Sequence, residues 1–266
     1  MNKQKFNLHT HTARCGHAEG LDIQYIHSAI DAGFTMLGFS EHIPYPEMHL
    51  PACRMLYEQK NEYLDTIRNL QRGFQDKINI KVGFEVEYMN DHVDFLMQMK
   101  QECDYMILGQ HCREIGYEYD CYCSDEDVLH YVKQIEDALK LGIITYVAHP
   151  DYFMLGRRLF SEVCVEAAHR IARASILHDI PLEINLNGFH YGKKTYRFSS
   201  KPGLQAERYP YPFREFWDFV SSYGCRVVYG FDAHSPITLL EAHRIHMAEE
   251  ILEGIPLNFT DAICLR

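Results

Sequence analysis

The chain alternates seven times between a short apolar run with strand character and a longer segment with a helical pattern. The predicted strands cover 5–10, 35–40, 78–86, 104–110, 143–148, 181–186 and 226–231. The predicted helices cover 21–32, 54–76, 90–102, 124–141, 160–179, 211–223 and 237–252. Such alternation is typical of an α/β protein with a parallel sheet. Seven units in 266 residues favour a single barrel domain over residues 1–266 rather than an open sheet.

Metal-binding side chains lie at the carboxyl ends of six predicted strands. In chain order they are His9 with His11, His42, Glu85, His111, His149, and Asp232 with His234. In a parallel barrel these strand ends meet on one face, which is where active sites are built. Neutral imidazoles bind zinc and similar metals, and carboxylates can bridge two ions. The recurrence therefore predicts a multinuclear metal site on that face.

The spacing within two strands adds detail to this prediction. Residues two apart in a strand project to the same side, so His9 and His11 can bind one ion together. The same spacing leaves two candidate acids on the third strand, because Glu85 and Glu87 point to the same side.

The composition excludes several classes of partner. The formal net charge is −11, whereas proteins that bind nucleic-acid polymers usually present a basic surface. No apolar stretch approaches the roughly 20 residues that cross a bilayer, and the first residues leave no room for a signal peptide before His9. Nine cysteines, odd in number and without a CxxC pair, are typical of reduced thiols. We therefore expect a cytoplasmic protein without a membrane or nucleic-acid partner.

Seven ordered motifs resemble those of the PHP (polymerase and histidinol phosphatase) family. They are His9-Thr10-His11-Thr12, Cys15-Gly16-His17-Ala18, Ser40-Glu41-His42, Gly83-Phe84-Glu85, His111, Ala148-His149-Pro150 and Asp232-Ala233-His234. The resemblance runs from residue 9 to about 236 and is closest to the stand-alone histidinol-phosphatase type. It implies a distorted seven-stranded (β/α) barrel, up to three divalent ions (zinc, iron or manganese), and hydrolysis of phosphate esters.

The resemblance also implies a ligand set for each ion. One ion would be held by His9, His11, Glu85 and Asp232; a second by Glu85, His111 and His149; and a third by His17, His42 and His234. Glu85 is preferred to Glu87 because it matches the family's Gly-Phe-Glu position. A metal-bridged hydroxide would attack phosphorus, and no catalytic residue is assigned apart from the metal ligands.

A phosphate monoester needs donors beyond the metals, and the arginine fork suits phosphate best. The candidates, which lie in loops near the predicted ligands, are Arg158, Arg197, Arg157, Arg113 and His190. L-Histidinol phosphate, the substrate that the resemblance implies, needs acidic or aromatic partners for its amine and imidazole. The candidates are Tyr117, Tyr119, Asp120, Asp151 and Tyr152. The stretch 109–113 departs from the family's more apolar pattern, which bears on the substrate more than on the chemistry.

Three other functions remain open. A metal-dependent amidohydrolase also has an HxH pair. It normally has eight strands, however, with a metal-bridging lysine or carboxylate on the fourth, where this chain has His111. A non-catalytic metal-stabilised module would lack some ligands, whereas all nine positions hold competent ones. A PHP phosphoesterase could also act on another small phosphate ester or a nucleotide.

Two further segments carry expectations about the fold. The stretch 193–212 is too long for an ordinary loop and is expected to form an excursion on the substrate side. Trp217 sits in an aromatic-rich helical stretch and is expected in the core.

Overall fold

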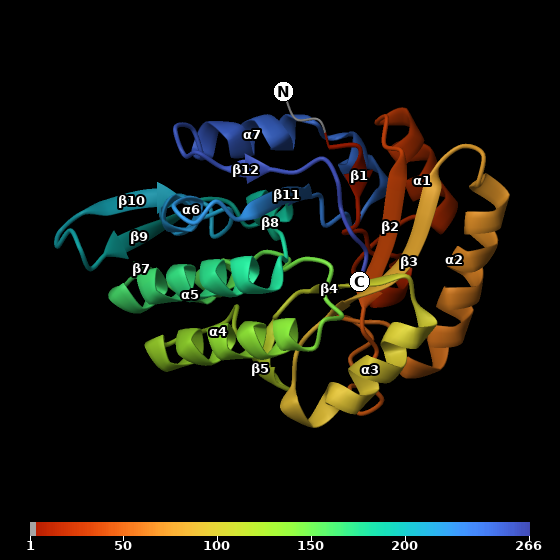
Figure 1. Ribbon diagram of the computed structural model, residues 1–266, viewed down its shortest axis with the longest axis horizontal. Helices are drawn as coiled ribbons and strands as arrows, with labels where there is room; N and C mark the ends of the chain where they lie inside the picture. Colours follow the sequence, from red (N-terminus) through yellow and green to blue (C-terminus); the bar gives the residue numbers. More distant parts are fainter. Residues whose placement is uncertain (1–3) are drawn as a thin grey trace.

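The computed structural model describes residues 4–266, and seven of its strands form two parallel sheets (Figure 1). The first sheet has the order β1-β2-β3-β4, with β1 (Phe6–Asn7), β2 (Met36–His42), β3 (Asn79–Val86) and β4 (Tyr105–Leu108). The second has the order β12-β11-β8, with β8 (Leu182–Asn185), β11 (Arg226–Gly230) and β12 (Asn258–Phe259). The predicted α/β class with a parallel sheet is confirmed.

Single bridged residues join the two sheets. Thr10 pairs with Ala233, and Val147 pairs with both Leu108 and Leu182. The predicted strand over 143–148 is therefore reduced to a bridge at Val147. The ladder of hydrogen bonds between this segment and β8 does not extend further toward the N-terminus, because Pro181 has no N–H to donate to the next bond. The sheets consequently meet without one continuous barrel ladder.

Helices follow the strands and lie on the outside of the sheets (Figure 1). They are α1 (Asp22–Asp31), α2 (Lys60–Phe74), α3 (Val93–Glu102), α4 (Asp125–Lys140), α5 (Glu162–His178), α6 (Arg214–Ser221) and α7 (His243–Ile251). Short 3₁₀ helices add η1 (Ala13–Cys15), η2 (Tyr57–Gln59), η3 (Asn90–His92), η4 (Tyr152–Gly156), η5 (Asn187–Tyr191) and η6 (Pro236–Leu240). All seven predicted helical segments contain an α-helix, and each of these helices is shorter than its predicted segment.

Alternate residues of β4 face two different clusters of apolar side chains. Met106 and Leu108 belong to the large cluster between sheet and helices, whereas Tyr105 and Ile107 belong to a smaller cluster with Phe6. The remaining buried members of the smaller cluster are Leu8, Tyr146, Ala148 and Val228. All come from the strand regions of both sheets, so this cluster fills the space that the strands enclose.

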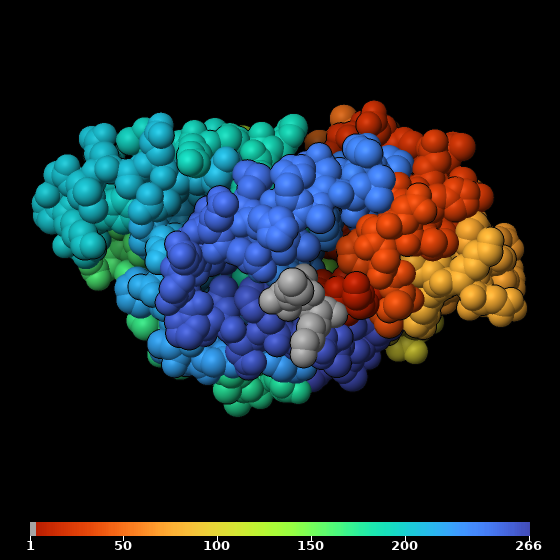
Figure 2. Space-filling view, turned by 90° about the horizontal axis from the view of Figure 1, so that it is seen from above, coloured from red at the N-terminus to blue at the C-terminus, as the bar shows by residue number. Residues whose placement is uncertain are grey.

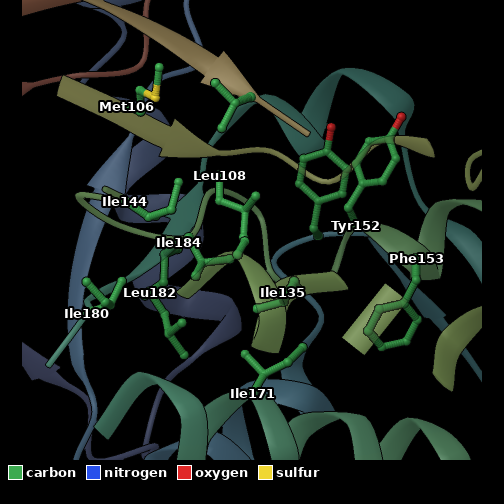
Figure 3. Packing of buried hydrophobic residues seen from close by; sticks show 14 of the residues in the cluster. Met106, Leu108, Ile135, Ile144, Tyr152, Phe153, Ile171, Ile180, Leu182 and Ile184 are labelled. Atoms are coloured by element: carbon green, nitrogen blue, oxygen red, sulfur yellow. The ribbon is translucent and has the colours of Figure 1, made fainter. Parts of the chain in front are cut away.

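The large cluster attaches the helices to the sheets. In Figure 3, apolar side chains from β4 and β8 lie close to side chains from α4 and α5, and the labelled residues include Met106, Leu108, Ile135, Ile171, Leu182 and Ile184. Trp217 on α6 is fully buried, which confirms its predicted place in the core.

The predicted excursion is an antiparallel hairpin of β9 (Lys194–Phe198) and β10 (Gln205–Arg208), and β9 also pairs with β7 (Leu159–Phe160). A second hairpin joins β5 (Cys112–Glu114) to β6 (Tyr117–Glu118). Figure 2 shows the C-terminal part of the chain (blue) packed against the N-terminal part (red), in agreement with the Thr10–Ala233 bridge. Among residues 4–266, no helix is both long and apolar enough to cross a membrane.

Candidate metal centre

The structure brings the nine predicted ligand residues together at the carboxyl ends of the parallel strands. Ring centroids lie 4.2 Å apart for His11 and His42, and 4.2 Å apart for His11 and His234. His17 joins this group at 4.6 Å from His234. On the other side, the rings of His111 and His149 are 4.9 Å apart.

Five overlapping groups of side chains in the described chain could each hold a cation. They are His9/His11/Asp232, His9/Glu85/His149, His42/Glu85/His111, His11/His42/His234 and Cys15/His17/His234. Glu85 belongs to two groups, which suits a bridging carboxylate. These groups differ from the set implied by the family resemblance in four ways. His11 also lies with His42 and His234, and His17 lies with Cys15. His42 also lies with Glu85 and His111, and His9 also lies with Glu85 and His149.

The geometry within these groups suits ligands of a shared cation. Atom pairs include His42 Nδ1 and Glu85 Oε2 at 3.1 Å, and His9 Nε2 and Asp232 Oδ1 at 3.4 Å. Zinc bonds of about 2.0–2.1 Å at a tetrahedral angle place two ligand atoms about 3.3 Å apart. These same four atoms are buried without a hydrogen-bond partner. Because buried polar atoms are rarely left unpaired, the cluster fits bound cations.

Burial and neighbouring charges shift the pKa values of several carboxylates and histidines in the cluster. Burial raises the pKa of the Glu85 carboxyl, but the neighbouring histidines, His111 foremost, outweigh burial and hold it well below its usual value. Burial lowers the pKa of His11, but the neighbouring carboxylates, Asp232 and Glu41 foremost, outweigh burial and raise it to about 9. Burial, reinforced by His11, lowers the pKa of His234 to about 3. Bound cations would replace the protons on the histidines and offset the negative charge of the buried carboxylates.

The backbone is strained at two of the clustered residues. His149 has a φ of 29° and Asp232 a φ of 48°, in a region that side chains other than glycine rarely adopt. Among the described non-glycine residues, only Asp179 at the end of α5 shares a positive φ. Strain of this kind persists where surrounding structure enforces it and concentrates at functional sites.

Gly109 allows the central carboxylate its position. A Cβ added at Gly109 would lie 1.9 Å from Glu85 Oε1, so an alanine would displace that carboxylate. We expect Gly109→Ala to lower bound metal and any metal-dependent activity at least tenfold, as measured by elemental analysis and turnover. Gly73 in α2 is the matched control, since a Cβ there meets no atom within 4 Å. Gly73→Ala should keep wild-type metal content and gain about 0.5–1 kcal/mol of stability.

A cavity of about 510 Å³ opens onto the cluster. Seven of the clustered residues line it. The other polar and aromatic residues of the lining are Arg54, Glu118, Asp120, Tyr152, Asn187, His190, Tyr191 and Tyr211. Of the predicted substrate contacts, His190, Asp120 and Tyr152 are therefore at the cavity. Five of these lining residues were not predicted from the sequence: Arg54, Glu118, Asn187, Tyr191 and Tyr211. The one sequence signal for any of them is that Glu118 lies two residues before the predicted contact Asp120.

The four predicted arginines do not line this cavity. Arg157 pairs with Asp125 at 2.6 Å, and Arg113 pairs with Asp127 at 2.9 Å. Arg158 lies over the ring of Tyr196, at 5.7 Å from its centroid, and Arg197 is exposed on β9. The first two are committed to structural ion pairs. Phosphate binding by any of the four stays a prediction.

Three of the residues predicted to contact the amine or imidazole of the substrate also have other partners. Tyr117 donates a hydrogen bond to Asp127, and Tyr119 donates one to Gln134, both away from the cavity lining. Asp151 is buried and accepts hydrogen bonds from the Phe213 backbone and the Trp217 indole. These three side chains thus have structural partners.

The PHP domain model matches residues 7–187, more than half of the chain. The chain belongs to the PHP domain family. It is 25% identical over 238 residues to the probable histidinol-phosphatase of Deinococcus radiodurans, covering 86% of this chain and 85% of that protein. It is 28% identical over 145 residues to the histidinol-phosphatase of Bacillus subtilis, covering 51% of this chain and 53% of that one.

A solved structure has the same fold. The histidinol phosphate phosphatase of Lactococcus lactis, complexed with zinc, L-histidinol and phosphate, matches with a TM-score of 0.70 and 21% identity, over 98% of this chain and 99% of that one. This PHP-family phosphoesterase is therefore related to histidinol-phosphatases at low sequence identity, and its fold matches theirs.

Proposed function

We propose that this PHP protein is a metal-dependent phosphomonoesterase that hydrolyses L-histidinol phosphate to L-histidinol and phosphate, in histidine biosynthesis. The observation that carries the proposal is a buried histidine–carboxylate cluster opening onto a cavity with acidic and aromatic walls. The names of the relatives support it, as does the zinc, L-histidinol and phosphate in the Lactococcus lactis structure.

Up to three divalent ions, zinc, iron or manganese, would be the cofactors. When bound, they supply positive charge for the phosphoryl oxygens and activate water as the nucleophile. Their ligands would be the nine residues of the cluster: His9, His11, His17, His42, Glu85, His111, His149, Asp232 and His234. Glu85 holds the central place, because its two oxygens face histidines from four different segments.

The cavity wall would recognise the organic part of the substrate. Glu118 and Asp120 line it with carboxylates, and Asp120 Oδ1 is buried without a hydrogen-bond partner. Such oxygens suit an ammonium group. Tyr152 and Tyr211, whose ring centroids are 5.9 Å apart, offer aromatic surface for an imidazole.

We further propose that residues 1–266 form one PHP-type domain with a distorted seven-unit barrel. The β-bridges at Val147 and Thr10 support this interpretation, since they connect both edges of the first sheet to the second sheet. We propose a cytoplasmic location, because all nine cysteines are unpaired. The partner would be a small phosphorylated metabolite, not a nucleic-acid polymer or a membrane.

Phosphate release from L-histidinol phosphate tests the proposal, with manganese- or zinc-loaded protein and p-nitrophenyl phosphate as the comparison. We expect kcat/KM to be far higher for histidinol phosphate. Asp120→Asn should raise KM for histidinol phosphate about tenfold and leave the generic ester unchanged, since only the former carries an ammonium group.

Other outcomes would replace the proposal. Turnover of the generic ester alone would keep the phosphoesterase and discard this substrate in favour of another small phosphate ester or a nucleotide. Failure on both esters by metal-loaded protein would favour an amidohydrolase or a non-catalytic, metal-stabilised module.

A further inference from the structure

Glu87 directly follows β3 but lies outside the groups that could hold a cation. The groups found among residues 4–266 contain Glu85 and not Glu87. Glu87 is fully buried, and its oxygens already have partners. Oε1 lies 3.0 Å from His111 Nδ1 and accepts a hydrogen bond from Arg54 Nη2 at 3.0 Å, while Oε2 accepts one from Arg54 Nη1 at 3.3 Å. Its carboxylate is therefore committed to one arginine and one histidine.

Arg54 makes this buried carboxylate possible. Only 4% of Arg54 is exposed, and its Nη1 also donates to the Ile43 carbonyl at 3.0 Å. The guanidinium of Arg54 offsets the negative charge of the buried Glu87 carboxylate, with its Nη2 lying 3.0 Å from Glu87 Oε1. A two-pronged arginine contact holds a carboxylate in a fixed plane. Glu87 is thus an ionised, oriented hydrogen-bond acceptor.

The contact determines which nitrogen His111 can offer to a cation. A neutral imidazole carries one N–H, and a carboxylate beside Nδ1 holds the proton there. The lone pair is then on Nε2, which lies 3.4 Å from Glu85 Oε1. His111 consequently faces the central carboxylate with the atom that can bind a metal.

We propose that Arg54 and Glu87 are positioning residues that hold His111 for the cation it shares with Glu85. This inference rests on the metal centre of the proposed function but not on its substrate. Arg54 also lines the cavity, with Leu50, Ala52 and Cys53 of the same segment. The ion pair thereby connects the cavity wall to a metal ligand.

The other buried carboxylates behind the cluster lack this connection. Glu183 lies 2.9 Å from His9 Nδ1, and it accepts hydrogen bonds from the His149 backbone and the Asn185 amide. Glu41 lies 3.6 Å from His11 Nδ1, and it accepts hydrogen bonds from Thr12. Within the described chain, neither Glu183 nor Glu41 has an arginine or lysine among its ion-pair partners. Of these three carboxylates, only Glu87, which contacts His111, is paired with an arginine.

The test measures metal retention without substrate. Wild type, Glu87→Gln, Arg54→Met and the double variant are loaded with cobalt and dialysed against a competing chelator. Retained metal is then measured by elemental analysis, and the ligand environment by the visible absorption spectrum. We expect each single variant to bind the cation shared by His111 and Glu85 about 10–100-fold less tightly, with an altered spectrum. The double variant should resemble Glu87→Gln alone, since both changes act through one contact.

Glu136→Gln is the matched control, because Glu136 forms a comparable two-pronged ion pair with Arg170, 2.6 and 2.9 Å long, between α4 and α5. It should retain metal like the wild type. Cooperative unfolding of each metal-free variant separates positioning from loss of folding. If Arg54→Met alone fails to fold, the charge-neutral double variant and Glu87→Gln decide.

Two results would overturn the inference: wild-type retention and spectrum in Glu87→Gln and the double variant, or a wild type that binds no cation. Weakened retention in these variants, together with a wild type that binds metal but hydrolyses no phosphate ester, would support the inference and overturn only the proposed function.

Discussion

Replacing Glu85 with glutamine is expected to lower phosphatase activity at least about a thousandfold and to release bound metal. Glu85 is 1% exposed, and its oxygens lie within 2.8–3.4 Å of nitrogens on His149, His42 and His9. An amide keeps the shape but removes the negative charge that would offset the proposed cations. Loss of several kcal/mol of charge stabilisation corresponds to a factor of this size. Steady-state turnover and elemental analysis of the purified variant would check it.

Glu47→Gln provides the control for this substitution. Glu47 is exposed and lies 3.4 Å from His92 Nε2, outside the cluster. It should leave metal content and turnover unchanged. Retention of full activity and metal by Glu85→Gln would show that the cluster does not work as a shared-carboxylate centre.

Truncating Trp217 to alanine is expected to destabilise the fold by about 3–5 kcal/mol. The indole is fully buried and packs against Phe216, with ring centroids 5.6 Å apart. Its Nε1 donates to Asp151 Oδ2 at 3.1 Å, two residues beyond His149. The substitution therefore leaves both a cavity and a weaker set of partners for a buried carboxyl. Chemical unfolding followed by circular dichroism is the suitable measurement, because the variant has lost the chain's one tryptophan.

Trp217→Phe separates the two contributions. It retains most of the ring volume and loses only the N–H donor, so a smaller cost of about 1–3 kcal/mol is expected. Equal destabilisation by alanine and phenylalanine would mean that the hydrogen bond to Asp151, not packing, is the main contribution of the indole.

The sequence alone predicted which side chains gather at the strand ends, because that information is local. His9 and His11 are two apart in an extended segment, and strand geometry places them on one side whatever follows. The parallel arrangement then gathers each strand end on one face, so His111 and His149 needed only the alternation of strands and helices to be placed. The match of the PHP domain model to residues 7–187 agrees with those motifs.

Tertiary structure alone decided what depends on partners distant in sequence. Arg157 looked available for phosphate, but Asp125, 32 residues away, pairs with it. Glu87 and Glu85 were equivalent by spacing, but in the structure Glu87 pairs with Arg54 whereas Glu85 faces the histidines of the cluster. Pro181 limited the ladder at Val147 through a missing N–H across the sheet. The periodicity of the sequence determines which side of an element a residue faces. The packing of distant segments determines which charged or hydrogen-bonding partner it contacts there.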